Sequence, residues 1–144
     1  MHSSLRGDVF VRRATSQHRE ILNGSRLRLL DRPASIREAI QRVRFVVHHG
    51  SMAMSEEALA SGRPQIVAPS YLEHLLTARA LVSLGVARVA RSTRDLEQTS
   101  HLLAATADDQ QTTRAAAEFA ERYWSAGGPG QDLPDQLLAQ VGVA

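Results

Sequence analysis

Residues 45–69 read FVVHHGSMAMSEEALASGRPQIVAP, and this stretch decides the fold. It opens with an apolar run that ends in His-Gly-Ser. An Ala-, Met- and Glu-rich segment follows and stops at Gly62, with Pro64 beyond it, which is typical of a helix end. A second apolar run then ends in Pro69. This order predicts two parallel strands joined by a helix, and the run at 45–47 predicts a strand covered on both faces.

The same alternation extends in both directions along the chain. Apolar periodicity and Gly or Pro breaks mark the further elements. The expected strands are 8–13, 25–31, 44–49, 65–69 and 86–90, and the expected helices are 35–43, 51–62, 70–85, 92–108, 109–127 and 133–141. Ser35 and Ser70 are the expected helix caps. The sequence therefore predicts an α/β fold, a Rossmann-like parallel sheet with helices on both faces, in one domain over residues 1–144.

Composition excludes several classes of protein. The sequence has no cysteine, which rules out disulfide frameworks, thiolate zinc sites and cysteine nucleophiles. No apolar run approaches the roughly 20 residues that span a bilayer. The first residues lack the apolar centre of a signal peptide. We therefore expect a cytoplasmic protein without a membrane span.

The charge pattern is unusual because all seventeen basic residues are arginine. They are dispersed along the chain, and the formal net charge is only +2. Aromatic residues make up 4% of the sequence, so platforms for base stacking are scarce. This pattern favours a solvated arginine surface and predicts no nucleic-acid partner.

The junction at 48–51 carries residue types that suit an anion. Gly50 lets the backbone turn tightly and approach a ligand closely. The helix that follows offers free N–H groups and the positive end of its dipole. His49 can add a ring N–H donor, and a carboxylate at Glu57 suits vicinal hydroxyls such as those of a ribose. On residue chemistry alone, a phosphate-and-ribose site and an ordinary βα turn both stay open.

The order of residues over 46–86 adds a family resemblance. The pattern is His-Gly, Glu-Ala-Leu, Gly-x-Pro, a strand ending in Pro, an acidic residue and a closing Leu-Gly. It is carried by His49, Gly50, Glu57, Ala58, Leu59, Gly62, Pro64, Pro69, Glu73, Ala78, Leu84 and Gly85. Together with the strand, loop and helix at 27–47, it resembles the C-terminal, nucleotide-sugar-binding domain of GT-B-fold glycosyltransferases of the UDP-glycosyltransferase type. The resemblance covers roughly 65 residues.

That resemblance implies a donor site for a nucleotide-sugar, a UDP- or dTDP-sugar, with no metal and no further cofactor. The implied contacts are His49, Gly50, Ser51 and Ser55 with the diphosphate, Glu57 with the ribose, Glu73 and His74 with the sugar, and Arg32, Pro33 and Ala34 beside the base. The implied reaction is transfer of a hexosyl group to an acceptor. The acceptor site and catalytic base are implied to lie in an N-terminal half, so no catalytic residue is assigned in this chain.

Several positions depart from the family pattern. They are Ser51 and Ala53 in place of glycines, Met54 in place of Thr or Ser, His74 in place of Gln, and Thr77 in place of Asn. These departures indicate either an unusual donor or a weakened pocket.

The assignments also have structural alternatives. Glu73 stands three residues after Ser70, which is the spacing of a capping box. Glu57 can also be an ordinary solvated helix residue, a role for which the neighbouring Glu56 competes. His48 is expected on the face opposite His49, which argues against a zinc site formed by these two residues and His74. Met52 and Met54 are expected to fill the core. Tyr123 and Trp124 are expected to anchor the late helix.

The family's domain opens with a strand, a Gly-rich turn and a helix that have no clear equivalent before residue 8. Three hypotheses follow. The chain is a donor-binding fragment of a transferase, inactive alone; or a non-catalytic donor-binding subunit that needs a separate acceptor-domain chain; or an epimerase-like fragment that works on nucleotide-sugars. An exposed apolar face beside the site would favour the second.

Overall fold

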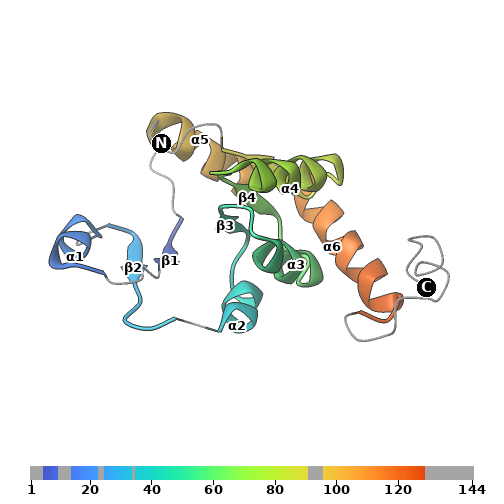
Figure 1. Cartoon of the computed structure of the whole chain (residues 1–144), viewed down its shortest axis with the longest axis horizontal. Helices are drawn as coiled ribbons and strands as arrows, with labels where there is room; N and C mark the ends of the chain where they lie inside the picture. Colours follow the sequence, from blue (N-terminus) through green and yellow to red (C-terminus); the bar gives the residue numbers. More distant parts are fainter. Residues whose placement is uncertain (1–4, 10–13, 23–24, 34, 91–95, 129–144) are drawn as a thin grey trace.

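The computed structural model describes residues 5–9, 14–22, 25–33, 35–90 and 96–128. Strands and helices alternate along most of this length, as predicted (Figure 1). The order is β1 (Gly7–Val9), α1 (Ser16–Leu22), β2 (Leu27–Leu29), α2 (Ile36–Gln41), β3 (Val46–His48), α3 (Met52–Ala60), β4 (Gln65–Val67), α4 (Leu72–Ser83), β5 (Ala87–Val89), α5 (Leu96–Ala107) and α6 (Gln110–Ser125).

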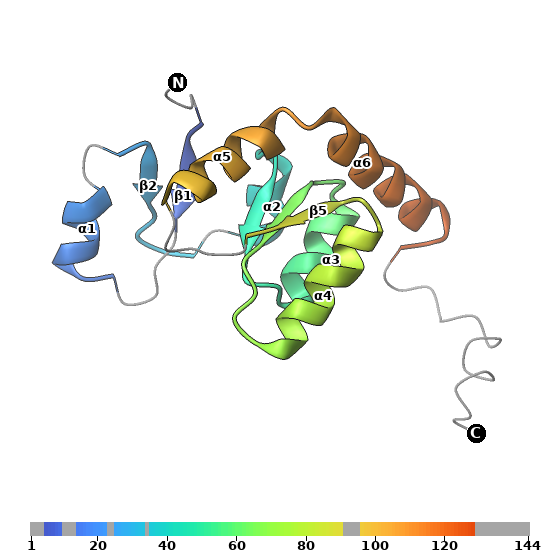
Figure 2. The ribbon, with the colours of Figure 1, turned by 90° about the horizontal axis from the view of Figure 1, so that it is seen from above.

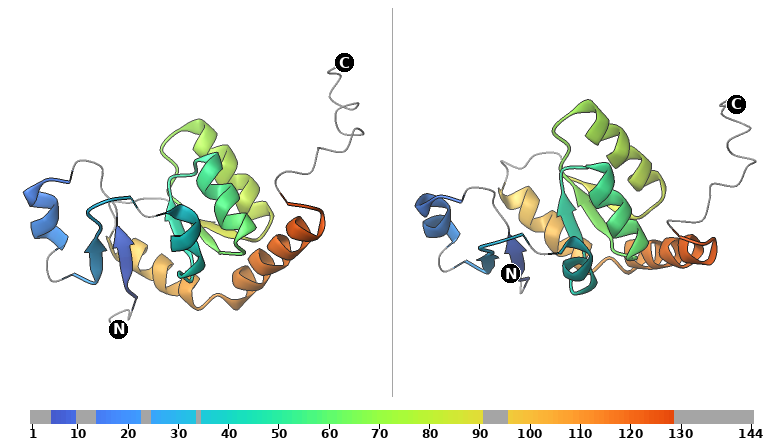
Figure 3. Two further views of the ribbon diagram at one scale, coloured as in Figure 1. Left: turned by 90° about the horizontal axis from the view of Figure 1, so that it is seen from below. Right: turned by 60° about the horizontal axis from the view of Figure 1, so that its bottom comes forward.

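The described strands form two parallel sheets. One pairs β1 with β2, and the other has the order β3-β4-β5. β4 lies at the centre of the larger sheet, and its three residues are buried. Figures 2 and 3 show α3 and α4 on one face of this sheet and α5 with the start of α6 on the other. The structure thus confirms the predicted α/β fold with helices on both faces.

The core of the larger sheet is built from small and branched side chains. Val67 and Val86 contact Ala78 and Leu81 of α4. Ala116 of α6 joins the same cluster because α6 repeats an apolar stripe at helical spacing, and this stripe packs against α3. A smaller cluster contains Ile40, Val46 and Ala58, with Met54 packed against it.

Most predicted helix ends are confirmed. Ser35 caps α2, and its hydroxyl accepts a hydrogen bond from the Glu38 N–H. α3 and α4 are followed by Gly62 and Gly85, both with positive φ. The predicted helix 133–141 and part of the predicted strand 8–13 lie outside the described residues.

Three predictions about these elements were wrong, and one helix was not predicted. Tyr71, not Ser70, occupies the N-cap of α4 and makes no side-chain cap, so the capping-box explanation of Glu73 fails. Val47 is 53% exposed, so β3 is covered on one face only. Met52, at the start of α3, is 66% exposed and so does not fill the core. No helix was expected at 16–22, where α1 forms.

Trp124 anchors the late helix, as predicted. Its Nε1–H donates to the Ala60 carbonyl oxygen at 2.7 Å, which ties α6 to the C-terminal end of α3. The Tyr123 ring lies edge-on to the indole. Within the described ranges, no helix is long and apolar enough to cross a bilayer.

Asp109 links the start of α6 to β5. Its carboxylate accepts hydrogen bonds from the backbone N–H and the hydroxyl of Thr112, and it pairs with Arg88 at 2.6 Å. The bonds from Thr112, and after them those from Arg88, lower the pKa of the Asp109 carboxyl from its ordinary value. The charged form is therefore the form that stabilises the fold.

We expect Asp109→Ala to lower the free energy of unfolding by about 0.5–2 kcal/mol at pH 7, the usual loss for a helix cap. Because the folded pKa is lowered, this contribution is present above about pH 4 and is lost as pH falls through the folded value. Urea unfolding at several pH values measures both effects. Asp108→Ala, at the exposed neighbour, is the control, and an equal loss in the two variants would contradict the capping role.

Candidate functional site

The candidate site lies at the junction between the end of β3 and the start of α3. Side chains alternate in β3, so Val46 and His48 are buried while Val47 and His49 are exposed. His48 therefore lies on the face opposite His49, as predicted. Its Nδ1 accepts the Gly50 N–H at 3.1 Å, which places its ring proton on Nε2, 2.8 Å from the Gln65 side-chain oxygen.

Burial lowers the pKa of the His48 ring; the bond to Gln65 opposes this, and the nearby His49 and His74 lower the pKa further. The neutral ring is the form that the geometry requires, because only an unprotonated Nδ1 can accept the Gly50 N–H. His48 is thus a structural support of the turn.

The backbone conformation and the close packing at position 50 require a glycine. Its φ is +103°, a conformation that side chains with a Cβ rarely adopt. A Cβ at this position would lie 3.0 Å from the carbonyl oxygen of His74 and 3.1 Å from the Val67 side chain. The backbone of α4 therefore closes against the turn, and the glycine permits that close approach.

The first turn of α3 lies at the surface, with Met52 and Ala53 exposed. Ser51 is its N-cap, and the Ser51 side chain makes no capping hydrogen bond. The first N–H groups of the helix have no intrahelical partner, and the helix dipole favours negative charge at this end. Ser55 differs, because it is buried and its hydroxyl donates to the Ser51 carbonyl oxygen at 2.9 Å. Ser55 therefore holds the turn from inside.

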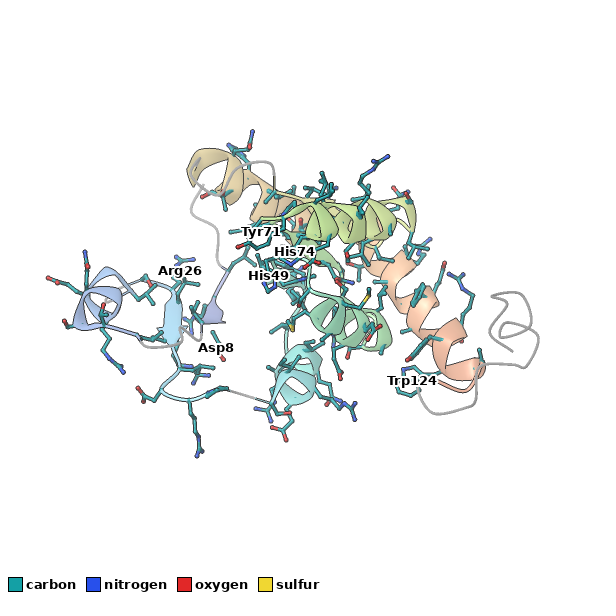
Figure 4. All side chains as sticks on the ribbon, viewed as in Figure 1. Asp8, Arg26, His49, Tyr71, His74 and Trp124 are labelled. Carbon is teal, nitrogen blue, oxygen red and sulfur yellow. The ribbon has the colours of Figure 1, made fainter. Side chains whose placement is uncertain are left out.

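Three aromatic rings meet beside this turn (Figure 4). The His49 and His74 ring centroids are 4.7 Å apart, and the Tyr71 ring lies edge-on to His74 at 5.3 Å. His74 is 8% exposed, and its Nδ1 has no hydrogen-bond partner. Its Nε2 lies 3.4 Å from a carboxylate oxygen of the exposed Glu73. The residues predicted for phosphate and for sugar are thus brought together.

The other predicted residues lie further along the elements. Glu57 is half-buried on α3 and pairs with Arg37 of α2 at 3.4 Å, whereas Glu56 is exposed. Arg32 and Pro33 are exposed between β2 and α2. Among the described residues, no hydrogen bond or ion pair joins that loop to His49 or to the start of α3. Ala34 lies outside the described residues.

Residues that sequence reasoning missed complete the site. Gln65 and Tyr71 act through tertiary contacts that no local pattern reveals, although Tyr71 stands only two residues after the strand predicted to end at Pro69. An apolar surface adjoins the rings on α4, made of Tyr71, Leu72, Leu75 and Leu76, all exposed. In the part of the chain that the structure describes, no three metal-ligating side chains come together.

The sequence matches no protein-family model and no curated protein. The structure is similar to solved glycosyltransferases. The spinosyn forosaminyltransferase SpnP matches with a TM-score of 0.69 and 18% identity over 98% of this chain and 45% of its own. VinC in complex with dTDP matches with a TM-score of 0.69 and 22% identity over 85% and 31%. SnogD from Streptomyces nogalater matches with a TM-score of 0.60 and 24% identity over 82% and 30%.

These likenesses confirm the predicted fold, a Rossmann-like part of the GT-B architecture. The chain spans less than half the length of each of these three proteins. At such identities the likeness shows the fold alone. A function has to be argued from the residues of this chain.

We expect Gly50→Ala to be more damaging than Gly85→Ala. Both positions have positive φ, which costs a residue with a Cβ about 1–2 kcal/mol. Only at Gly50 would the Cβ also press on a backbone oxygen, which adds about 1–3 kcal/mol of overpacking; at Gly85 the nearest atom lies at 3.8 Å. Urea unfolding of both variants measures the difference. Equal losses would show that α4 does not close on the turn.

We expect the free energy of unfolding to fall as the pH drops from 7.5 to 5.5, partly through His48. Its folded pKa is lowered, so its contribution is present above about pH 6.5, the unfolded value, and is lost as pH falls from there. His48→Asn keeps an acceptor for the Gly50 N–H without that titration. Its pH dependence should be flatter than that of the unchanged chain, while His101→Asn, at an exposed histidine, should not flatten it. Parallel curves for all three proteins would rule out the role of His48.

Proposed function

We propose that this chain binds the donor nucleotide-sugar of a GT-B-type glycosyltransferase. One observation carries the proposal: the turn at Gly50 presents the uncapped N-terminus of α3 beside the exposed ring of His49. This arrangement favours an anion with several oxygen acceptors, such as a diphosphate. It lies after the C-terminal end of a parallel strand, the place where open α/β sheets bind ligands.

The roles proposed for the side chains follow the order along the chain. His49, Gly50 and Ser51 hold the diphosphate, and Ser55 supports the turn behind them. Glu57 binds the ribose hydroxyls, oriented by its pair with Arg37. Glu73 and His74 bind the sugar, and the loop 32–34 lies beside the base. The proposed donor is a UDP- or dTDP-hexose, and VinC, which has a similar fold, was solved with dTDP.

The proposed contribution to chemistry is electrostatic. When a glycosidic bond to the donor phosphate breaks, negative charge builds on the leaving diphosphate. N–H groups at a helix start and a ring N–H from His49 are fixed in advance and stabilise that charge without reorganisation. The acceptor and the base that activates it are proposed to come from another domain or chain.

One observation favours a chain that works with a separate acceptor domain. The apolar surface of Tyr71, Leu72, Leu75 and Leu76 lies directly beside the rings of the site. Leu72 is 72% exposed, which is costly for a side chain of this type unless a partner covers it. A second domain seated there would close over the donor.

Isothermal titration calorimetry with UDP, dTDP and GDP tests the donor site. We expect selective binding of UDP or dTDP, and about tenfold weaker binding in His49→Ala, since one charge-assisted hydrogen bond is lost. His101→Ala, an exposed histidine on α5, is the matched control and should bind as the unchanged chain does. Unchanged affinity in His49→Ala would remove His49 from the site, and no binding of any nucleotide would contradict the proposed function.

A further inference from the structure

A cavity lies at the end of the larger sheet opposite to the candidate site. Arg44 stands two residues before β3, Arg63 stands two residues before β4, and both line the cavity. Because β3 and β4 are parallel, their starts share one edge of the sheet, whereas Gly50 follows the other edge. The bend where α5 passes into α6 forms a further wall (Figure 2). The volume of about 520 Å³ is within the range of small-ligand sites.

Three arginines from three separate segments line this basic cavity. They are Arg44, Arg63 and, on α6, Arg114. Within the described ranges, none of the three pairs with a carboxylate, whereas four other arginines do. A concave surface lined by charges of one sign concentrates ions of the opposite sign. The cavity therefore favours an anion.

Backbone hydrogen bonds hold two of these guanidinium groups. The Nε–H of Arg63 donates to the Ile40 carbonyl oxygen at 3.2 Å, and its Nη2 donates to the Gln41 carbonyl oxygen at 2.8 Å. Nη2 of Arg44 donates to the Ala107 carbonyl oxygen. An arginine has five N–H donors, so both side chains keep donors for a ligand. Because the side chains are already held, less conformational entropy is lost when a ligand binds.

The same bonds also have a structural effect. The accepting carbonyl groups lie at the C-terminal ends of α2 and α5, where a helix leaves its last carbonyl groups unpaired. This effect accounts for the bonded N–H groups of Arg44 and Arg63 only. Among the described residues, no partner bonds to the guanidinium group of Arg114, so the fold gives that side chain no role.

Two carboxylates also line the cavity. Asp109 is engaged elsewhere, since Arg88 pairs with it at 2.6 Å and Thr112 donates to it. Asp108 is exposed, and in the part of the chain that the structure describes no basic side chain pairs with it. Three guanidinium groups therefore meet one unpaired carboxylate, and the cavity keeps a positive charge.

The remaining lining residues indicate which kind of anion fits. Gln110 and Thr113 of α6 are exposed and polar, and none of the described lining residues is aromatic. A nucleoside base would therefore have no ring on which to stack. Guanidinium groups match the oxygen atoms of phosphate, which can accept from several of them at once. The arrangement thus favours a phosphate group without a base.

We propose that the basic cavity is a second binding site, for a small ligand that carries a dianionic phosphate group and no aromatic base. Arg44, Arg63 and Arg114 donate to the phosphate oxygens, and Gln110 contacts the uncharged part of the ligand. The bound phosphate connects the segments before β3 and β4 with α6. This inference does not rest on the proposed donor site, which lies at the other end of the strands.

An NMR titration of the full chain, resolved by residue, tests the proposal. The probes are inorganic phosphate, glucose 6-phosphate and glucose, at about pH 8, where phosphate groups carry close to two charges. The ionic strength is kept constant because salt screens exposed charges. We expect saturable shifts of the Ala107, Thr113 and Ala117 amides with both phosphates and none with glucose. Tighter binding of glucose 6-phosphate assigns the site to a phosphate ester, and equal binding assigns it to the free ion.

The amides of Gly50 and Ala53 report the proposed donor site in the same spectra. Shifts at the basic cavity without shifts at these two amides support the cavity alone, whatever the donor site does. Failure of one site is therefore distinguished from failure of the other.

Three variants separate ligand binding from a general effect of charge. Arg114→Gln should bind glucose 6-phosphate about five- to tenfold more weakly, because it loses a charge-assisted hydrogen bond at a partly open site. Arg122→Gln is the matched control, since it removes the same charge from the same helix outside the cavity, and it should bind as the unchanged chain does. Asp108→Asn removes the repelling carboxylate and should tighten binding about threefold.

Several results would overturn the proposal. One is the absence of saturable shifts at the Ala107, Thr113 and Ala117 amides below about 10 mM phosphate or glucose 6-phosphate. Another is that glucose shifts these amides as strongly as its phosphate does. Equal affinities of Arg114→Gln and Arg122→Gln, or a failure of Asp108→Asn to tighten binding, would also contradict it.

Discussion

The side chain of Gln65 holds together the end of the structure that carries the candidate site. It is fully buried at the start of β4, and it reaches two neighbouring elements at once. Its oxygen meets His48 Nε2, and its amide nitrogen donates to the Ser55 carbonyl oxygen at 3.4 Å. His48 in turn accepts the Gly50 N–H. This network fixes the strand end, the turn and the first turn of α3 relative to one another, and each buried polar group in it has a partner.

A consequence is that the groups proposed to bind a ligand are separated from the supporting ones. His48 and Ser55 are directed inward and are satisfied within the chain. His49 and the start of α3 are directed outward. Two adjacent histidines therefore differ in role: the His48 ring positions Gly50, and the His49 ring is exposed, where we propose that it donates to a ligand. The alternation of a β-strand produces this division.

Local signals in the sequence were enough to predict the alternation of strands and helices, because Gly62, Pro64 and Gly85 mark the helix ends clearly. They were also enough to place His49 and Gly50 at a strand end. The exposure of Val47 could not be predicted in this way, because it depends on which elements pack against that face of β3. The inward direction of Ser55 and the contact of Tyr71 with His74 depend likewise on how α3 and α4 pack. The N-cap of α4 was misplaced because a serine after proline resembles a cap whether or not its side chain bonds.

The hydrogen bond between Trp124 and the Ala60 carbonyl oxygen also allows the packing of α6 on α3 to be followed by tryptophan fluorescence. Trp124 is the sole tryptophan of the sequence, so its emission comes from one known place. That place is the C-terminal end of α3, whereas the candidate site is at the N-terminal end of the same helix. Intrinsic fluorescence therefore reports whether α6 stays docked on α3. Quenching of Trp124 or a shift of its emission maximum measures this contact separately from changes at the N-terminal end of α3.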